Sequence, residues 1–333
     1  MTDATRAVGT KETAGAQPLW SNLLPHSTHA RVLFLIRGLA ILGLIVAAMT
    51  TPGFFTAVSL FSLLNTTSFI GCVAVGMTFI TLSGNIMSFA LGATVGVTAM
   101  VFIVAANRLG FGAGLLVGVI FGSLLTGLQG LLIGLVRANP IIISIAALAL
   151  IYGVTQVFSE KGTIYADQGT VPALAKGKIA GVPIEFVVFL VSAVIAQFIL
   201  SATRFGRNLF MVGSSFRAAE AVGVSTWRTI TGAYLWAGVF TSLAGIMLAI
   251  RYDSANMDYG VAYDYDAIAA VLVGGTAIGG GSGSALRTFA GAMVIAAVQV
   301  MLLLKGLRQE WQYLAAGLIV LAVIVLQARG SGR

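Results

Sequence analysis

Seven side chains that can form hydrogen bonds without carrying a charge stand inside the long apolar runs of this 333-residue sequence. Amides, phenols and indoles offer donors, acceptors or a flat stacking face, so they suit an uncharged, hydroxyl-rich solute. Each of them could equally satisfy a hydrogen bond between two helices. The candidate solute-pathway residues are Asn65, Tyr152, Gln156, Gln197, Tyr234, Trp236 and Gln299.

Groups that could perform catalysis or bind a metal are scarce. The only histidines, His26 and His29, lie in a polar N-terminal segment, and no nucleophile–base pair or acid pair stands within an apolar run. We therefore expect no catalytic residue, no metal site and no enzymatic activity. The glycine cluster at 279–283 lacks the Gly-Lys-Ser/Thr ending of a phosphate-binding loop. Energy for any transport would then come from a partner or from an ion gradient.

The composition is that of a membrane protein. Hydrophobic residues make up 58% of the chain and charged residues only 9%, and the mean hydropathy is +0.98. These values lie far outside the range of soluble domains. The net charge of +8 comes from basic residues that flank apolar runs, so we expect contact with membrane lipid and not with nucleic acid. A single cysteine, Cys72, excludes an internal disulfide.

The apolar runs predict an all-α, polytopic fold with about ten transmembrane helices, because a span needs about twenty mostly apolar residues. Residues 1–31 are expected to form a disordered cytoplasmic tail, 32–328 the transmembrane domain and 329–333 a second cytoplasmic tail. The eighth candidate span is too short to cross unaided. The candidate spans are 32–49, 58–82, 89–106, 115–136, 141–158, 183–200, 229–250, 266–278, 289–304 and 314–326.

Lysine and arginine predict the orientation of the chain, because cytoplasmic loops collect basic residues. With the N-terminus inside, twelve of the 19 basic residues fall on the inner side and seven on the outer side. This distribution favours a cytoplasmic N-terminus. It also places the segment 201–228 in the cytoplasm.

A short helix is predicted within this cytoplasmic segment. Ser215 can cap a helix over 216–222, and Gly223 is placed to end it. Two turns are marginal in water, so something must hold the helix in place. Phe216, Ala219 and Gly223 share one side, and Arg217 and Glu220 can pair locally. The helix could insert into a cleft on a soluble partner, or it could simply turn the chain at the lipid headgroups.

Several motifs resemble the permease subunits of ribose-type, monosaccharide ABC importers. The run from Arg204 to Arg207 and the stretch from Val212 to Val224 are similar to the cytoplasmic coupling loop of that family, with Ser215 where the family commonly has Asn. The run 263–276, followed by the glycines of 279–283, resembles a long late-chain motif of the same family. Ala138–Ile142 and Trp311-Gln312 are also similar, so the resemblance covers nearly the whole chain beyond the tail.

The resemblance implies a multi-pass permease of the bacterial inner membrane that works by alternating access. It implies an ABC ATPase partner, which would bind ATP and Mg, so no cofactor is expected in this chain. It also implies a periplasmic or extracellular solute-binding protein and a second permease chain. The residues that would dock on the ATPase are Gly213, Ser215, Phe216, Arg217, Ala218, Ala219, Glu220 and Gly223.

One departure concerns the partner chain. Where the family typically has an acid after the second span, this sequence has Met87. No role of that carboxylate can be carried over. The second permease chain could be a copy of this one, giving a homodimer, or a non-identical chain that retains the acid, giving a heterodimer.

An acidic, tyrosine-rich outer loop spans 251–266. Asp258, Tyr263 and Asp264 are candidates for docking a solute-binding protein, and a solvated rim is the alternative interpretation. The main functional alternative to an ABC importer is an ion-coupled secondary transporter. Such a protein normally has ionisable groups within its spans, and here almost none lie away from the span ends.

Overall fold

Long apolar helices form nearly the entire molecule, as the computed structural model shows for residues 43, 46–159, 162–179 and 181–331. The predicted tail 1–31 and most of the predicted span 32–49 lie outside these residues. Seven of the described helices are long and apolar enough to cross a membrane. They are α2 (Ala57–Leu82), α3 (Leu91–Leu109), α4 (Phe111–Val136), α5 (Pro140–Phe158), α6 (Ile184–Ala202), α9 (Thr226–Tyr252) and α11 (Ala285–Leu304).

The final helix, α12 (Gln309–Ser331), has an apolar section over Gln309–Val325. The all-α, polytopic prediction is confirmed. Residues 329–331 of the predicted C-terminal tail continue α12.

Helix boundaries follow local signals in the sequence. The side chain of Asn139 accepts a hydrogen bond from the backbone N–H of Ile141 (2.9 Å), and Pro140 occupies the first position of α5. Gly110 separates α3 from α4 with φ +89°, a conformation that glycine adopts without strain. These signals make the predicted spans 58–82 and 141–158 agree with α2 and α5 to within one residue.

The glycines of α4 form a packing face. A Cβ on Gly122 would overlap Ser242 and Thr98, and one on Gly130 would overlap Tyr234. Small residues let helix backbones approach closely in the membrane, where no hydrophobic force drives the helices together. α4 therefore lies directly against α9 and α3.

A short helix and a non-helical link interrupt the series of long apolar helices. The helix α10 (Tyr263–Val273) has only 11 residues and ends at Gly274, before Gly275 with φ +78°. It is too short to cross, as predicted, although it starts and ends earlier than the predicted range 266–278. Residues 83–90 form a non-helical link between α2 and α3. Non-helical backbone at membrane depth is tolerated where protein surrounds it.

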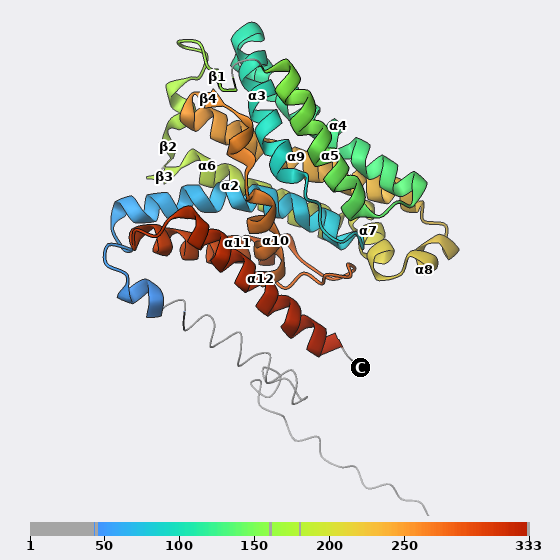
Figure 1. The fold of residues 1–333 in the computed structure, drawn as a ribbon. Coiled ribbons are helices and arrows are strands. Elements are labelled where there is room, and N and C mark those ends of the chain that lie inside the picture. The colour runs from blue at the N-terminus through green and yellow to red at the C-terminus, as the bar shows by residue number, and fades with distance from the viewer. Residues whose placement is uncertain (1–42, 44–45, 160–161, 180, 332–333) are drawn as a thin grey trace, which may run out of the picture.

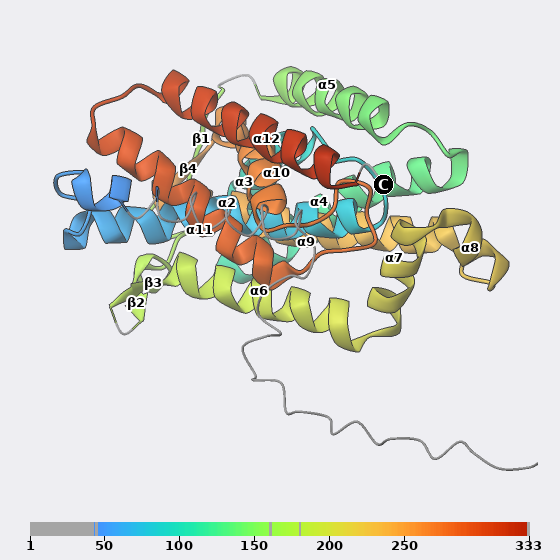
Figure 2. The same cartoon turned by 90° about the horizontal axis from the view of Figure 1, so that it is seen from below.

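The two ends of the helix bundle differ in structure. One end, called here the coupling end, carries α7 (Arg204–Ser214) and α8 (Phe216–Ala221). The opposite end, called the hairpin end, carries the antiparallel pair β2 (Lys178–Ile179) and β3 (Val182–Pro183). Both views in Figures 1 and 2 show α2 running between these ends. The remaining short elements are β1 (Ile164–Tyr165), β4 (Ser254–Ala255), which pairs with β1, η1 (Ala173–Lys176) and η2 (Met257–Gly260).

Candidate functional site

The short helix at the coupling end forms where the sequence predicts it. The Ser215 hydroxyl accepts a hydrogen bond from the backbone N–H of Ala218 (3.3 Å), and α8 ends one residue sooner than expected. Gly223 follows with φ +81°, and the N–H of Val224 donates to the Ala219 carbonyl (3.0 Å). Sequence analysis missed the preceding helix α7. Its start is capped by the Thr203 hydroxyl, which accepts from the N–H of Gly206 (3.1 Å).

The outward face of α8 is not the face that the residue spacing suggested. Ala219 is fully buried, and Phe216 packs against the main core of this chain. Ala218, Ala221 and Val222 are exposed instead, Val222 by 67%. Both sides of this helix carry small residues, so spacing alone could not distinguish the side that packs on the chain itself. Of the residues that the resemblance assigns to ATPase docking, Ser215, Arg217, Ala218, Glu220 and Gly223 are exposed, and the exposed Ala221 and Val222 lie beside them in the sequence.

An arginine from a distant helix holds α8 in place. Nη2 of Arg137 lies 2.7 Å from Oε1 of Glu220, and the Thr226 hydroxyl donates to the same oxygen (3.3 Å). The Arg137 guanidinium also lies 5.0 Å from the centre of the Phe216 ring. The local pairing of Arg217 with Glu220 expected from the sequence is therefore wrong. Arg137 caps α4 in the left-handed conformation (φ 54°), which places its side chain against α8.

A junction of three backbones connects α7 to α2. The N–H of Gly281 donates to the Leu82 carbonyl at the end of α2 (3.2 Å). A Cβ on Gly213 of α7 would overlap that same carbonyl oxygen, and a Cβ on Gly280 would overlap Gly84. Glycine is required at these positions because backbone atoms are in direct contact. We call this contact of Leu82, Gly84, Gly213 and the 280–281 turn the glycine junction.

A cavity of about 560 Å³ opens at the hairpin end, beside the first turns of α2. Seven of its residues share one face of α2, with spacings of one, three and four positions. Asn65 is only 5% exposed, and its Oδ1 has no hydrogen-bond partner among the described residues. The cavity is lined by Ala57, Val58, Phe61, Ser62, Asn65, Thr66, Phe69, Lys178, Leu248, Arg251, Tyr252 and Tyr263.

Of the seven candidate pathway residues, only Asn65 lines this cavity. Oε1 of Gln197 accepts from the Ser284 hydroxyl (2.9 Å), which is a helix–helix contact. Tyr234 is fully buried beside Gly130, and Trp236 stacks on Phe240 with ring centres 6.2 Å apart. The remaining three lie elsewhere: the half-buried Tyr152 in a second core cluster, Gln156 on the exposed surface and Gln299 beside Asp266.

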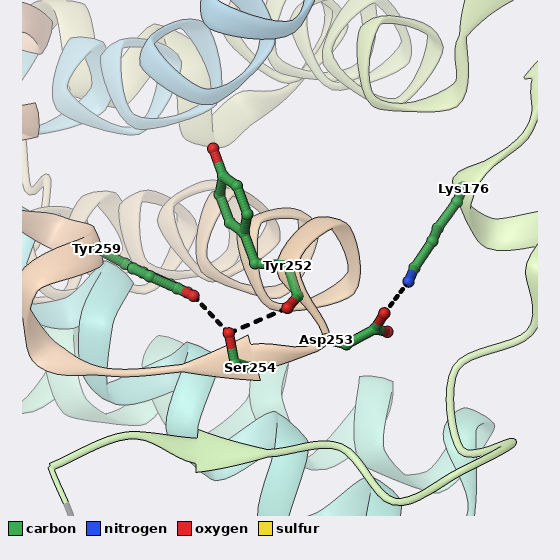
Figure 3. Close-up of polar contacts among 5 residues, drawn as sticks. All are labelled: Lys176, Tyr252, Asp253, Ser254 and Tyr259. Carbon is green, nitrogen blue, oxygen red and sulfur yellow. Dashed lines mark hydrogen bonds and ion pairs between the residues drawn. The ribbon is translucent and has the colours of Figure 1, made fainter.

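The loop after α9 is folded and hydrogen-bonded (Figure 3). The Ser254 hydroxyl bonds to the Tyr259 hydroxyl (2.6 Å) and to the Tyr252 carbonyl (3.1 Å), and Lys176 forms an ion pair with Asp253. These contacts fix the backbone beside Tyr252. Its ring points away from β4 in Figure 3, and it lines the cavity.

The three candidates for binding-protein docking occupy different environments. Asp258 is exposed, whereas Tyr263 lines the cavity. Asp264 is buried, and its Oδ1 accepts from the N–H of Gly92 at the start of α3 (2.7 Å). The first backbone N–H groups of a helix have no partner within the helix, and Asp264 accepts one of them. Asp264 is therefore unavailable as a docking residue.

Asp264 and Asp266 are both buried in the first turn of α10, at the start of the predicted span 266–278. The residue in place of the family acid, Met87, is buried as well, with φ 30°.

Comparisons with known proteins agree with this architecture. Residues 59–324 match the family described as branched-chain amino acid transport system / permease component. The ribose import permease protein RbsC of Haemophilus influenzae is 28% identical over 307 residues, covering 88% of this chain and 93% of the relative. RbsC of Bacillus subtilis is 30% identical over 304 residues, with 88% and 92% coverage.

A third relative is named for a different solute. The autoinducer 2 import system permease protein LsrD of Escherichia coli is 29% identical over 278 residues, covering 77% of this chain and 79% of the relative. No solved structure matches the chain. The family match spans most of the sequence and all seven long apolar helices except the first two residues of α2. The chain therefore belongs to the branched-chain amino acid transport system / permease component family and is a multi-pass membrane permease of the ribose-type ABC importer class.

Proposed function

We propose that this chain is the translocation subunit of an ATP-driven importer for a monosaccharide or a similar neutral solute. The observation that carries the proposal is the exposed face of α8, which is presented at the coupling end and attached to the membrane helices by Arg137 and the glycine junction. The relatives are named for the import of ribose and of autoinducer 2, which supports a small polar solute.

The mechanism follows from how α8 is attached. Two partner ATPases that close on binding ATP would move α8. Ala218, Ala221 and Val222 would provide the contacts with these ATPases. Arg137 would transmit that displacement to α4, and the glycine junction would transmit it to α2. A ligand changes an equilibrium only when its contacts differ between the two states. This condition is met if the cleft on the partner makes different contacts with α8 when the ATPases are open and when they are closed.

The remaining parts of the assembly are proposed on the same basis. The coupling end would lie in the cytoplasm of a bacterium with the N-terminus on that side, and the hairpin end would face a solute-binding protein. Asp258 remains as a docking residue for that protein. The second permease would be a different chain that has an acid where this one has Met87, and purification of a complex with one permease species would contradict this assignment.

Tagged purification from native membranes in mild detergent tests the proposal. We expect an ABC ATPase and a second permease to co-purify with this chain. Recovery of this chain alone, under conditions that preserve a known ABC complex, would contradict the proposal. The buried acids Asp264 and Asp266 make ion-coupled transport the second candidate, because intramembrane carboxylates commonly mark ion pathways. Uptake that survives ATP depletion but collapses with an uncoupler would favour it.

The ion pair between Arg137 and Glu220 gives a separate test. Exposed ion pairs contribute only about 0–1 kcal/mol to stability, so Arg137→Glu should leave the protein amount in the membrane unchanged. Uptake should fall severalfold, because the new carboxylate would repel Glu220 and remove the side-chain contact between α4 and α8. The double variant Arg137→Glu/Glu220→Arg restores the pair with reversed charges and should recover part of the uptake. Equal uptake in the wild type and both variants would show that this contact transmits nothing.

A further inference from the structure

The cavity beside α2 is polar on a face where a membrane helix could have been apolar. Ser62, Asn65 and Thr66 line it, and none of these side chains is hydrogen-bonded to another described residue. The next two hydroxyls behave differently, because Thr67 donates to the Leu63 carbonyl (2.7 Å) and Ser68 to the Leu64 carbonyl (2.6 Å). The unused hydrogen-bonding capacity of α2 is thus concentrated on the cavity side.

Asn65 is the most specific of these groups. Its side chain is buried, yet Oδ1 accepts no hydrogen bond within the described part of the chain. Buried polar groups without a partner are uncommon in folded proteins and indicate an absent ligand or water. An amide offers one acceptor and two donors, so it matches a hydroxyl, which both donates and accepts.

Aromatic side chains provide the apolar part of the cavity. Phe61 and Phe69 come from α2, Tyr252 from the end of α9 and Tyr263 from the start of α10. Such rings combine broad apolar faces with polar tips, which suits a ring that has C–H faces and a hydroxyl edge. A volume of about 560 Å³ also falls within the range of about 300–1,000 Å³ typical of small-molecule sites.

The charges at the mouth are largely compensated. Arg251 lies 3.3 Å from Glu185, and the ammonium of Lys178 lies 3.9 Å from the centre of the Phe61 ring. Both cations therefore have partners, and they leave N–H donors at the rim. A neutral solute fits this arrangement, because no acidic side chain lines the cavity to attract a cation.

We propose that this cavity binds a neutral, hydroxyl-rich ring in transit, with Asn65 as its main hydrogen-bonding residue. This inference rests on the proposed importer function and adds the site where the solute meets the chain. The site lies on α2, the same helix whose far end forms the glycine junction with α7. Movement of α8 can thus reach the solute through one helix.

The first experiment measures uptake of labelled ribose and ATP hydrolysis in the purified importer complex, reconstituted with its ATPase and binding protein. Asn65→Leu should lower ribose uptake by about tenfold or more, as loss of a central buried contact does. ATP hydrolysis should stay close to the wild-type rate, because α8 and the glycine junction are unchanged. Thr67→Val is the matched control, since its hydroxyl bonds only to its own helix, and uptake should be retained.

The two hypotheses fail in different ways. Normal ribose uptake by Asn65→Leu would overturn the solute site and leave the importer standing. The proposed function would be overturned if the wild-type complex showed no ATP-dependent uptake of ribose or of a panel of other neutral polyols. The proposed solute site would then be overturned as well.

A labelling experiment guards against a variant that merely misfolds. Cys72 is fully buried, so Ser62→Cys introduces one reactive thiol at the cavity. Ribose delivered by the binding protein should slow the reaction of this thiol with a polar maleimide. Leu174→Cys is the control, because Leu174 is 84% exposed and lies outside the cavity, and its labelling should not change. A Ser62→Cys thiol that ribose fails to protect, or that never reacts because lipid fills the cavity, would overturn the proposal.

Discussion

Replacing Ala218 with arginine should abolish uptake while the protein remains folded in the membrane. Ala218 is exposed on α8 and makes no side-chain contact that this chain needs, so a larger residue costs the fold little. If the proposed function is correct, this side chain would enter the interface with the partner ATPase, where the few residues that dominate binding each contribute about 2 kcal/mol or more. Uptake and co-purified ATPase, each normalised to the amount of membrane protein, measure the effect.

Two control variants separate docking from folding. Ala219→Arg places the same side chain at a fully buried neighbour, so it should lower the amount of folded protein itself. Ser201→Arg adds the same charge at an exposed position near the end of α6 and should leave uptake unchanged. If Ala218→Arg retains both uptake and bound ATPase, the outward face of α8 is not the docking surface.

Replacing Gly213 with alanine should be among the most damaging single-methyl changes in the described part of the chain. The new Cβ would overlap the Leu82 carbonyl and lie 2.5 Å from the backbone nitrogen of Gly281. These neighbours are backbone atoms, so no rotamer change can relieve the clash, and overpacking costs about 1–3 kcal/mol or more. We expect a lower unfolding temperature in detergent and a loss of uptake, because the junction between α7 and α2 must open.

Gly153→Ala provides the matched comparison for this variant. Gly153 lies on the exposed side of α5, and nothing lies within 4 Å of a Cβ placed there. Alanine favours a helix over glycine by about 0.5–1 kcal/mol, so this variant should be neutral or slightly stabilised. Equal unfolding temperatures for the Gly213 and Gly153 variants would show that the glycine junction tolerates an added methyl group.

The sequence by itself determined the class of the fold and the position of α8. Apolar length dictates spans because backbone groups in lipid must bond within their own helix, and this rule depends on no distant contact. The cap at Ser215 and the turn at Gly223 are equally local, so the helix between them was predicted to within one residue. The face of α2 that carries Phe61, Ser62, Asn65 and Thr66 was also present in the sequence as a helical spacing, and only Asn65 was recognised.

Only the tertiary structure decided which way these elements face and what they contact. Glu220 pairs with Arg137, 83 positions away, and not with its neighbour Arg217. Asp264 was expected on the outer surface and is buried, because folding brings it to the start of α3, 172 positions away, where it accepts a hydrogen bond from the Gly92 N–H. Seven polar residues in apolar runs looked equivalent, yet one lines a cavity. Local rules determine helices, whereas burial and charge pairing depend on which distant backbone packs beside each residue.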